Sequence, residues 1–516
     1  MLTKVISSAI EGIDGLLVDV EVDLSTGLPC FSIVGLPDSA VKESRDRVKS
    51  AICNSNFEFP PERITVNLSP ADIKKEGTLY DLPIAIGLLA DMGIIRQEDL
   101  KDFLVVGELS LDGSIKRVKG VLPMAITAKK EQVKGIVLPQ DNANEAAIVK
   151  GLEVYPVGNL LEVINFFRKE AKEPYKINLD KLFFKSSKYP VDFSDVKGQE
   201  HVKRALEIVA AGGHNLLMIG PPGSGKTMLA KRIPTILPDL SFEEAIEATK
   251  IYSITGLLKR EKSFVATRPF RSPHHTISDA GLIGGGRIPR PGEVSIAHNG
   301  ILFLDEFPEF RRHVLEVLRQ PLEEKVVTVS RAIQSITYPA NFILVAAMNP
   351  CMCGHYQDSR KECTCTPIGV KKYMAKISGP LLDRIDVQIY VPALKYEELI
   401  DERPSESSDA IKERVIRARD IQLERFKGDG AYPNALMSSS NLKNYCRLDK
   451  ESHEIMRKVI DKLGLSGRGY DKILKVARTI ADLDESENIK TEHITEAVQY
   501  RNLDRGRGVS LNQSEF

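Results

Sequence analysis

The chain has 516 residues, enough for about three domains of ordinary size. Its 71 Lys and Arg balance its 71 Asp and Glu, and this balance excludes a histone-like polycation and an acidic disordered tail. No uncharged apolar run reaches the length of a membrane-spanning helix, about 18 residues, and seven Cys argue against a secreted disulfide framework. We therefore expect a soluble, cytoplasmic protein of several domains.

The first 167 residues predict a compact α/β domain. Alternating or continuous apolar residues predict strands at residues 15–22, 64–68 and 103–107. Apolar residues at helical spacing predict helices at residues 39–51, 82–92 and 121–131. Residues 168–190 are rich in charged residues and contain Pro174 and Pro190, which is typical of a linker.

The rest of the chain predicts two further regions. In residues 191–400, short buried-type strands alternate with helices, which is typical of a parallel sheet. Residues 401–409 form a polar hinge, and residues 410–516 are mostly helical by pattern. The helices are expected at residues 411–426, 452–463, 471–483 and 491–500.

Eight consecutive residues fit the G-x-x-x-x-G-K-[ST] pattern of a phosphate-binding loop. They are Gly220, Pro221, Pro222, Gly223, Ser224, Gly225, Lys226 and Thr227. An apolar strand precedes them and a helix follows, a context that disfavours the alternative of a plain glycine-rich turn. In such a loop Lys226 would reach the β- and γ-phosphates and the Thr227 hydroxyl would bind Mg²⁺. We therefore predict a site for ATP and Mg²⁺.

Polar residues at the ends of two later strands would complete this site. An apolar run at residues 300–304 precedes Asp305, which would hold Mg²⁺ through water, and Glu306, which would polarise the attacking water. A second run ends at Asn349, whose amide could contact that water or the γ-phosphate; the alternative is a turn-forming Asn-Pro pair. Arg384 is a candidate arginine finger, with an ordinary Arg–Asp surface pair as the alternative.

Four of the seven Cys lie within fifteen residues, directly after Asn349 and Pro350. They are Cys351, Cys353, Cys363 and Cys365. Structural zinc takes four thiolate or imidazole ligands in a tetrahedron, and this loop is long enough to bring the two pairs together. The C-x-C spacing is tighter than usual, so reduced thiols without metal and an iron–sulfur or redox centre remain alternatives. We predict a structural zinc site.

Residues 250–290 contain eight basic and two acidic residues, a net charge of +6. The basic residues are Lys250, Lys259, Arg260, Lys262, Arg268, Arg271, Arg287 and Arg290. Such a segment could contact nucleic-acid phosphates without regard to sequence, and a solvated surface or a charge seam between subunits is the alternative. The adjacent His274 and His275 have no evident third metal ligand and are interpreted as loop structure.

The order of these features resembles that of AAA+ ATPases. A P-loop, an Asp-Glu strand, a strand that ends in Asn, a late Arg and a C-terminal helical lid follow one another. Residues 268–286 and 291–300 look like the magnesium-chelatase-like branch with its helix-2 insert, and residues 466–470 and 477–483 resemble its C-terminal domain. The resemblance places Arg468 at the second sensor position, which contacts the phosphates from the lid, and makes Arg478 a weaker candidate.

The N-terminal domain resembles the proteolytic domain of Lon at residues 75–84 and 107–120. Leu79 stands where that resemblance places the nucleophilic Ser, and residues 121–124 offer no amine for its Lys partner. An unconventional pair among Ser69, Lys74, Lys75 and Thr78 remains the alternative. We expect a catalytically silent Lon-like module.

The whole arrangement resembles the YifB/ComM family of magnesium-chelatase-like AAA+ ATPases. It comprises a Lon-like α+β domain (1–167), a linker (168–190), a P-loop αβα core with a Cys-rich loop at 351–365 (191–400) and a helical lid (401–516). The resemblance implies a homohexameric ring that hydrolyses ATP and acts as a helicase or branch-migration factor on single-stranded or branched DNA, in DNA uptake or recombination. The alternative is a chelatase-type ATPase that remodels a protein partner in metal insertion or regulation.

Overall fold

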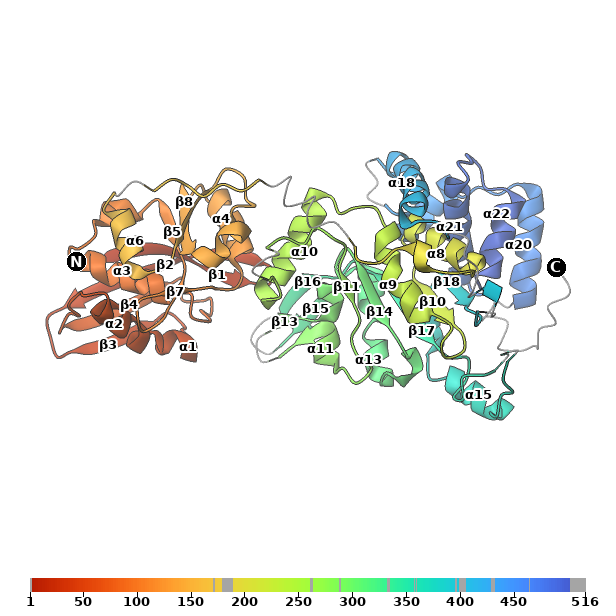
Figure 1. Ribbon diagram of the computed structural model, residues 1–516, viewed down its shortest axis with the longest axis horizontal. Helices are drawn as coiled ribbons and strands as arrows, with labels where there is room; N and C mark the ends of the chain where they lie inside the picture. Colours follow the sequence, from red (N-terminus) through yellow and green to blue (C-terminus); the bar gives the residue numbers. More distant parts are fainter. Residues whose placement is uncertain are drawn as a thin grey trace. The chain divides into compact units, whose positions relative to one another are not determined.

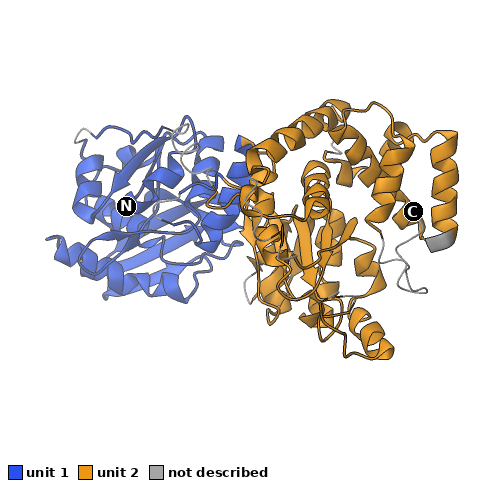
Figure 2. Ribbon diagram, turned by 45° about the vertical axis from the view of Figure 1, so that its right-hand side comes forward, with its two compact units in different colours: residues 1–186, 242–266 blue, residues 187–241, 267–516 orange. Residues whose placement is uncertain are grey.

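The computed structural model describes residues 2–169, 172–178, 189–259, 263–286, 289–331, 335–356, 358, 360–394, 397–398, 405–427, 432–463 and 465–501. The chain forms two compact units, coloured separately in Figure 2. The first comprises residues 1–186 with 242–266, and the second comprises residues 187–241 with 267–516. No helix within the described ranges has both the length and the apolar character needed to cross a lipid bilayer.

A mixed sheet of seven strands forms the centre of the first unit, in the order β3-β4-β2-β1-β5-β8-β9. The strands are β1 (Thr3–Glu11), β2 (Asp14–Ser25), β3 (Cys30–Val34), β4 (Arg63–Ser69), β5 (Phe103–Val105), β8 (Gly135–Pro139) and β9 (Glu153–Val157). Ile64, Val66 and Leu68 of β4 are buried while the residues between them are not, the alternation expected of a strand with one covered face. The three strands predicted in this region are confirmed as β2, β4 and β5.

Helices and a short β6–β7 ladder (Glu108–Leu109 and Ile115–Lys116) complete the part of this unit before residue 168. The helices are α1 (Ser39–Lys42), α2 (Ser44–Asn54), α3 (Asp81–Asp91), α4 (Val121–Lys130), α5 (Ala143–Ala146) and α6 (Leu160–Phe167). The predicted helices at 82–92 and 121–131 are confirmed as α3 and α4. The predicted helix at 39–51 is two helices, because the chain bends at Glu43 and the Ser44 hydroxyl donates to the Val41 carbonyl at 2.7 Å.

One helix of the first unit comes from far along the chain. Helix α10 (Phe242–Thr255) packs on α4 and belongs to this unit in Figure 2. The buried Glu145 accepts hydrogen bonds from the Ser253 hydroxyl and from the backbone N–H of Leu122, and Lys250 pairs with Asp14 at 2.7 Å. Residues 242–266 thus group with the N-terminal unit, although they lie within the range expected for the ATPase core.

The second unit is built on a parallel sheet of five strands in the order β11-β14-β17-β10-β18. The strands are β10 (Leu216–Ile219), β11 (Phe270–Arg271), β14 (Ile301–Leu304), β17 (Ile343–Met348) and β18 (Val387–Tyr390). Every residue of β10 and β14 is buried, which explains why both strands appear in the sequence as unbroken apolar runs. The expected α/β fold with a parallel sheet is confirmed (Figure 1).

Helices and two small hairpins surround this sheet. The hairpins are β12–β13 (Gly284–Gly285 and Arg290–Pro291) and β15–β16 (Val326–Ser330 and Ser335–Pro339). The helices up to residue 382 are α8 (Glu200–Gly212), α9 (Lys226–Ile236), α11 (Asp279–Ile283), α12 (Glu293–Ile296), α13 (Arg312–Glu316), α14 (Arg319–Glu324), α15 (Pro367–Met374) and α16 (Gly379–Leu382).

The C-terminal part of the second unit is helical, as predicted. Its helices are α18 (Ser408–Arg425), α19 (Ser439–Tyr445), α20 (Lys450–Leu463), α21 (Gly467–Leu483) and α22 (Thr491–Gln499). Helices α18 and α21 pack on α8, as Figure 1 shows. Arg478 is 2% exposed, binds Asp482 and donates to the carbonyls of Ser486 and Glu487. Arg478 is therefore a structural residue of this helical core, and its assignment as a weaker phosphate sensor is not supported.

A buried carboxylate joins the sheet to these helices. Asp386 accepts a hydrogen bond from the backbone N–H of Asn215 at 2.8 Å and pairs with Lys472 of α21, and His214 lies 3.8 Å away. Burial alone would raise the pKa of Asp386, but Lys472 and His214 more than offset this and hold the pKa well below its usual range. Because the folded-state pKa is depressed, this stabilisation is present at neutral pH and is lost only in strong acid.

Replacing Asp386 with Ala is expected to destabilise the second unit by about 3–5 kcal/mol, because the buried Lys472 would lose its counter-charge. The melting temperature of the full-length variant, measured by scanning calorimetry, tests this. Asp383→Ala, at a half-buried position of the same segment, is the control. An unchanged melting temperature in Asp386→Ala would contradict the assigned role.

Candidate nucleotide-binding site

The P-loop follows the carboxyl end of β10 and leads into α9. Gly223 and Gly225 have φ angles of +75° and +89°, left-handed conformations that favour glycine. Lys226 is 8% exposed, and its Nζ donates to the carbonyls of Gly220 at 2.8 Å and Pro221 at 2.9 Å. Burial lowers the pKa of Lys226, and the nearby Asp305 opposes this shift. The loop therefore holds the amine of Lys226 against its own backbone.

Three strand ends converge at this edge of the sheet. The Thr227 hydroxyl donates to Asp305 Oδ2 at 2.7 Å, and Lys226 Nζ lies 3.4 Å from Asn349 Oδ1. Asp305 Oδ1 accepts the backbone N–H of Glu306 at 2.9 Å. A hydroxyl and a carboxylate side by side are oxygen ligands of the kind that Mg²⁺ prefers. The structure thus brings together four residues that the sequence predicted for one site.

Glu306 is turned toward a residue that the sequence interpretation missed. Its Oε2 lies 3.0 Å from Nδ1 of His275, and its side chain is 60% exposed. His275 follows β11, which pairs in parallel with β14, so the two strands deliver His275 and Glu306 to the same edge. The run before Glu306 was evident in the sequence, but β11 consists only of Phe270 and Arg271 and gave no apolar signal that would have placed His275 beside it.

The two predicted arginines lie at the opposite edge of the sheet. Arg384 precedes β18, and its carbonyl accepts a hydrogen bond from Asn215, which precedes β10. Strands β10 and β18 are parallel, and Leu216 is in register with Val387. Arg384, three residues before Val387, therefore lies at the amino edge of the sheet, whereas the P-loop lies at the carboxyl edge. A four-residue strand separates the two edges by about 13 Å.

At that amino edge, Arg384 and Arg468 share one carboxylate. Arg384 is 8% exposed, donates to the Pro380 carbonyl at 2.6 Å and pairs with Glu323 of α14. Arg468, at the start of α21, lies 3.7 Å from the same Glu323 and is 62% exposed. Within one chain, both arginines therefore group with Glu323 and not with the P-loop.

The four predicted zinc ligands form one cluster. Their Sγ atoms all lie within 4.8 Å of one another, and Cys351 is 3.3 Å from Cys353 and 3.7 Å from Cys363. Tetrahedral zinc with Zn–S bonds of about 2.3 Å places its sulfur atoms about 3.8 Å apart. The backbone N–H of His355 lowers the pKa of the Cys353 thiol to about 5. The pKa values of Cys363 and Cys365 are raised, so it is the geometry of the four sulfur atoms that fits a tetrahedral cation.

This cluster touches the nucleotide-binding site. Gly354, between two of the cysteines, has a φ of +85°, and a Cβ atom placed on it would lie 2.7 Å from Cδ of Pro222 in the P-loop. The buried Tyr373 of α15 accepts the backbone N–H of Asn349, and burial raises the pKa of its hydroxyl to about 12. The Cys-rich loop therefore lies against the P-loop through Gly354, and the following helix α15 contacts Asn349 through Tyr373.

Several residues of the predicted basic segment have partners within the protein. Lys250 pairs with Asp14 in the first unit, Arg271 pairs with Glu293, and Arg268 donates to the carbonyl of Asn299. The segment is also divided between the two units at residue 266. Arg260, Lys262 and Arg287 lie outside the described residues. Contact of these residues with DNA therefore stays a prediction.

In the N-terminal unit, Thr78, Lys74 and Lys75, which were candidates for an unconventional protease pair, each bind a different group. Leu79 is buried; Thr78 donates to Glu108, and Lys75 to the Pro70 carbonyl. Lys74 pairs with Glu76 at 2.9 Å. Loss of the Ser–Lys chemistry and the likeness to the Lon domain both stay predictions.

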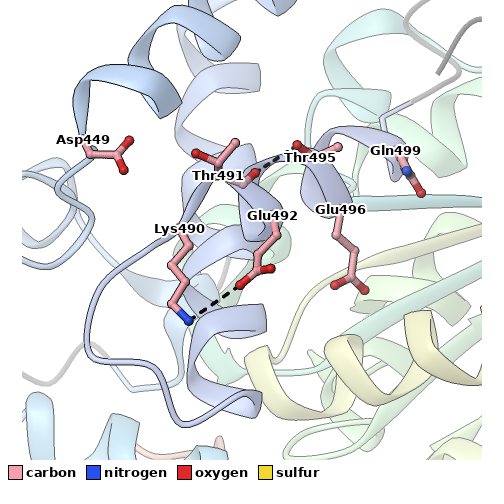
Figure 3. A pocket seen from close by; sticks show the side chains of 7 residues that line it. All are labelled: Asp449, Lys490, Thr491, Glu492, Thr495, Glu496 and Gln499. Atoms are coloured by element: carbon pink, nitrogen blue, oxygen red, sulfur yellow. Dashed lines mark hydrogen bonds and ion pairs between the residues drawn. The ribbon is translucent and has the colours of Figure 1, made fainter.

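A shallow hollow on the C-terminal helices does not have the character of a nucleotide site. Figure 3 shows the side chains around it: Asp449, Lys490, Thr491, Glu492, Thr495, Glu496 and Gln499. Its one lysine already pairs with Glu492 at 3.6 Å, and two further carboxylates face the same hollow. This negative lining disfavours phosphate.

The parallel sheet, the P-loop and the convergence of Thr227, Asp305 and Asn349 define a P-loop ATPase of the AAA+ class. Family models agree: "Magnesium chelatase, subunit ChlI" matches residues 192–399, "Subunit ChlI of Mg-chelatase" matches 20–142, and "Magnesium chelatase, subunit ChlI C-terminal" matches 405–501. The Competence protein ComM of Haemophilus influenzae is 45% identical over 510 residues, and YifB of Escherichia coli is 46% identical over 507, with 98% of each chain covered in both cases. The chain belongs to the YifB/ComM family of magnesium-chelatase-like AAA+ ATPases.

A more distant relative shares only part of the chain. The Magnesium-chelatase 38 kDa subunit of Rhodobacter capsulatus is 27% identical over 177 residues, which is 31% of this chain and 50% of the relative. The YifB/ComM family resemblance inferred from the sequence is thus confirmed over nearly the whole length, whereas the match to this relative covers about a third of the chain.

Proposed function

We propose that the protein is a Mg²⁺-dependent ATPase that assembles as a homohexameric ring in the cytoplasm and uses hydrolysis to move single-stranded or branched DNA. The observation that carries the ATPase is the cluster of Lys226, Thr227, Asp305 and Asn349 at the carboxyl edge of the sheet. Full-length similarity to a competence protein supports a role in DNA uptake or recombination. Motion of a strand in a ring needs sequence-independent phosphate contacts, which an electrically neutral chain can supply locally.

Each residue of the P-loop site would have a distinct role in ATP binding and hydrolysis. The left-handed glycines turn backbone N–H groups toward the phosphates, and Lys226 exchanges its carbonyl partners for phosphate oxygens. Thr227 and Asp305 would hold Mg²⁺, which supplies charge neutralisation at the phosphates when bound. Glu306 accepts the proton of the attacking water, and Asn349 orients that water or the γ-phosphate.

The place of the arginines supports the proposed ring assembly. Arg384 and Arg468 lie at the amino edge of the sheet, so they serve the nucleotide of a neighbouring protomer rather than their own. In a head-to-tail ring this edge of one subunit meets the P-loop of the next. Contact between neighbouring protomers would thus be required for turnover.

The zinc site supports the same catalytic centre. We propose that Cys351, Cys353, Cys363 and Cys365 bind one structural Zn²⁺, whose tetrahedron fixes the loop that carries Gly354. Gly354 in turn limits the movement of Pro222. The metal would have no direct part in hydrolysis.

Replacing Lys226 with Ala is expected to weaken ATP binding at least tenfold and to abolish hydrolysis, because its amine is the cation that the P-loop holds at this cluster. Calorimetry with Mg·ATP and a phosphate-release assay measure the two effects. Lys231→Ala, at an exposed position of the same helix α9, is the matched control. Wild-type turnover in Lys226→Ala would contradict the assigned site.

The DNA substrate has a separate test. ATPase rates with and without forked DNA, run beside mass measurement of the nucleotide-bound assembly, should show stimulation and a hexamer. If DNA does not stimulate the ATPase and no salt-sensitive DNA binding is measured, the proposed DNA substrate is contradicted but the proposed ATPase activity is not. The alternative, remodelling of a protein partner, is favoured by the matches to magnesium chelatase subunit ChlI, and capture of one stoichiometric partner protein would support it.

A further inference from the structure

Strand β3 of the first unit is apolar, and its outer edge is open. Four of its five residues are apolar, and none of the five is buried. It is the last strand of the seven-stranded sheet, so no further strand lies beside it in the described part of the chain (Figure 1). The neighbouring Leu28 and Leu36 are 88% and 54% exposed. Folded proteins rarely leave such an edge open, because its backbone N–H and C=O groups can pair with another chain.

The opposite edge of the same sheet is covered by the chain itself. Residues 172–178 follow β9, where the backbone N–H of Tyr175 donates to the Val154 carbonyl at 2.8 Å. The amine of Lys172 donates to the carbonyl of Pro156, two residues further along the strand. A second copy of the chain would therefore find the β9 edge occupied, and it can extend this sheet only at β3.

The first unit holds β3 in a fixed position. Phe31 stacks on Phe59 with ring centroids 6.4 Å apart. Directly after the strand, the Leu36 carbonyl accepts the backbone N–H of Lys75 at 3.2 Å, and the backbone N–H of Asp38 donates to the Lys75 carbonyl at 3.0 Å. An edge that is already ordered loses little conformational entropy when it binds a partner.

The edge is complementary to itself. Residues 26–37 contain no charged side chain, so two copies of this segment can meet without charge repulsion. Two identical strands that pair about a two-fold axis run antiparallel, and the register that pairs all five residues of β3 places Ser32 opposite its own copy. Phe31 then lies opposite Ile33, and such pairs of an aromatic and a β-branched side chain stabilise a sheet.

We propose that β3 pairs with β3 of a second copy of this chain, so that the two sheets join edge to edge. The contact is isologous and closes at two copies. Neighbours in a head-to-tail ring are not related by a two-fold axis, so we expect the contact to join protomers of two rings. A pair of five-residue strands is weak alone, and its repetition around two rings strengthens it. The pairing does not depend on ATP hydrolysis.

A disulfide trap tests the register. In the full-length protein with Cys30→Ser and Cys53→Ser, Ser32→Cys places two thiols directly opposite each other at the axis, within reach of a disulfide. Thr65→Cys is the matched control, because Thr65 of β4 is in register with Ser32 and is also partly exposed. The two copies of Thr65 lie about 14 Å apart, too far for a disulfide. Under mild oxidation, Ser32→Cys should form covalent dimer at least about tenfold faster than Thr65→Cys.

A charge at the axis should abolish the pairing. Ser32→Lys places two ammonium groups opposite each other, and like charges in directly opposed positions destabilise a strand pair. Native mass spectrometry should show a species of doubled mass in wild-type protein and its loss in Ser32→Lys, with an unchanged melting temperature, whether or not the protein hydrolyses ATP. Equal crosslinking of the two cysteine variants, no doubled species in wild type, or β3 bound to a different protein instead would each overturn the proposal.

Discussion

Replacing Arg384 with Ala is expected to lower ATP turnover by at least about 10³-fold while ATP affinity stays close to that of wild type. In the proposed ring the guanidinium would approach its nucleotide from another protomer, so the P-loop that binds ATP would be untouched in the variant. Arg384 lies at the amino edge of the sheet, about 13 Å of strand away from its own P-loop, which makes a contact within one chain implausible on geometric grounds. Phosphate release and calorimetry with Mg·ATP separate turnover from binding.

Two further variants make this result specific. Glu323→Gln weakens the ion pair that Arg384 makes within its own chain, and it should leave turnover largely intact if that pair is only structural. Mixing Arg384→Ala protein with Glu306→Gln protein should restore part of the activity, because a wild-type P-loop can then meet a wild-type arginine. Normal turnover in Arg384→Ala would contradict the assignment of Arg384 to the active site. The absence of rescue on mixing the two folded variants would contradict it as well.

Replacing Cys363 with Ser is expected to abolish bound zinc and to weaken ATP binding about tenfold, roughly 1.4 kcal/mol. One of four ligands is lost, and a structural zinc site rarely tolerates this. The loop that carries Gly354 then no longer supports Pro222. The P-loop is less ordered before ATP binds, and the free energy needed to order it lowers the affinity for ATP.

Metal content by mass spectrometry and ATP affinity by calorimetry measure the two consequences. Cys53→Ser, at an exposed position in the first unit, is the matched control and should keep the metal and the affinity of wild type. Wild-type protein without zinc would overturn the metal assignment. Loss of zinc with unchanged ATP affinity would overturn only the support of the P-loop.

Much of the fold could be predicted because local signals were strong. The apolar runs of β10, β14 and β17 are buried on both faces, and the residues that follow each run were recognisable as P-loop, Asp-Glu and Asn signals. Parallel strands place such residues at one edge, so the cluster of Lys226, Thr227, Asp305 and Asn349 followed from pattern alone.

The remainder depended on contacts between segments distant in the chain. Net charge counted along residues 250–290 did not reveal that Lys250 and Arg271 have carboxylate partners elsewhere. Arg478 looked like a sensor by motif, but its burial against Asp482 is a property of the packed helices. His275 was interpreted as loop structure, because two adjacent histidines were considered only as metal ligands. In the structure it lies beside the carboxylate of Glu306, at the same edge of the sheet.

Because α10 belongs to the first unit, the chain connects the two units at more than one point. The polypeptide passes between the two units at residues 186, 241 and 266, so three covalent connections join them rather than one tether. A truncation that removes residues 1–167 would strip the cover from the apolar side of α10, where Ala245, Ala248 and Ile251 are buried. The ATPase region and the N-terminal region are therefore not separable modules, and a stable fragment of either would need redesign of residues 242–266.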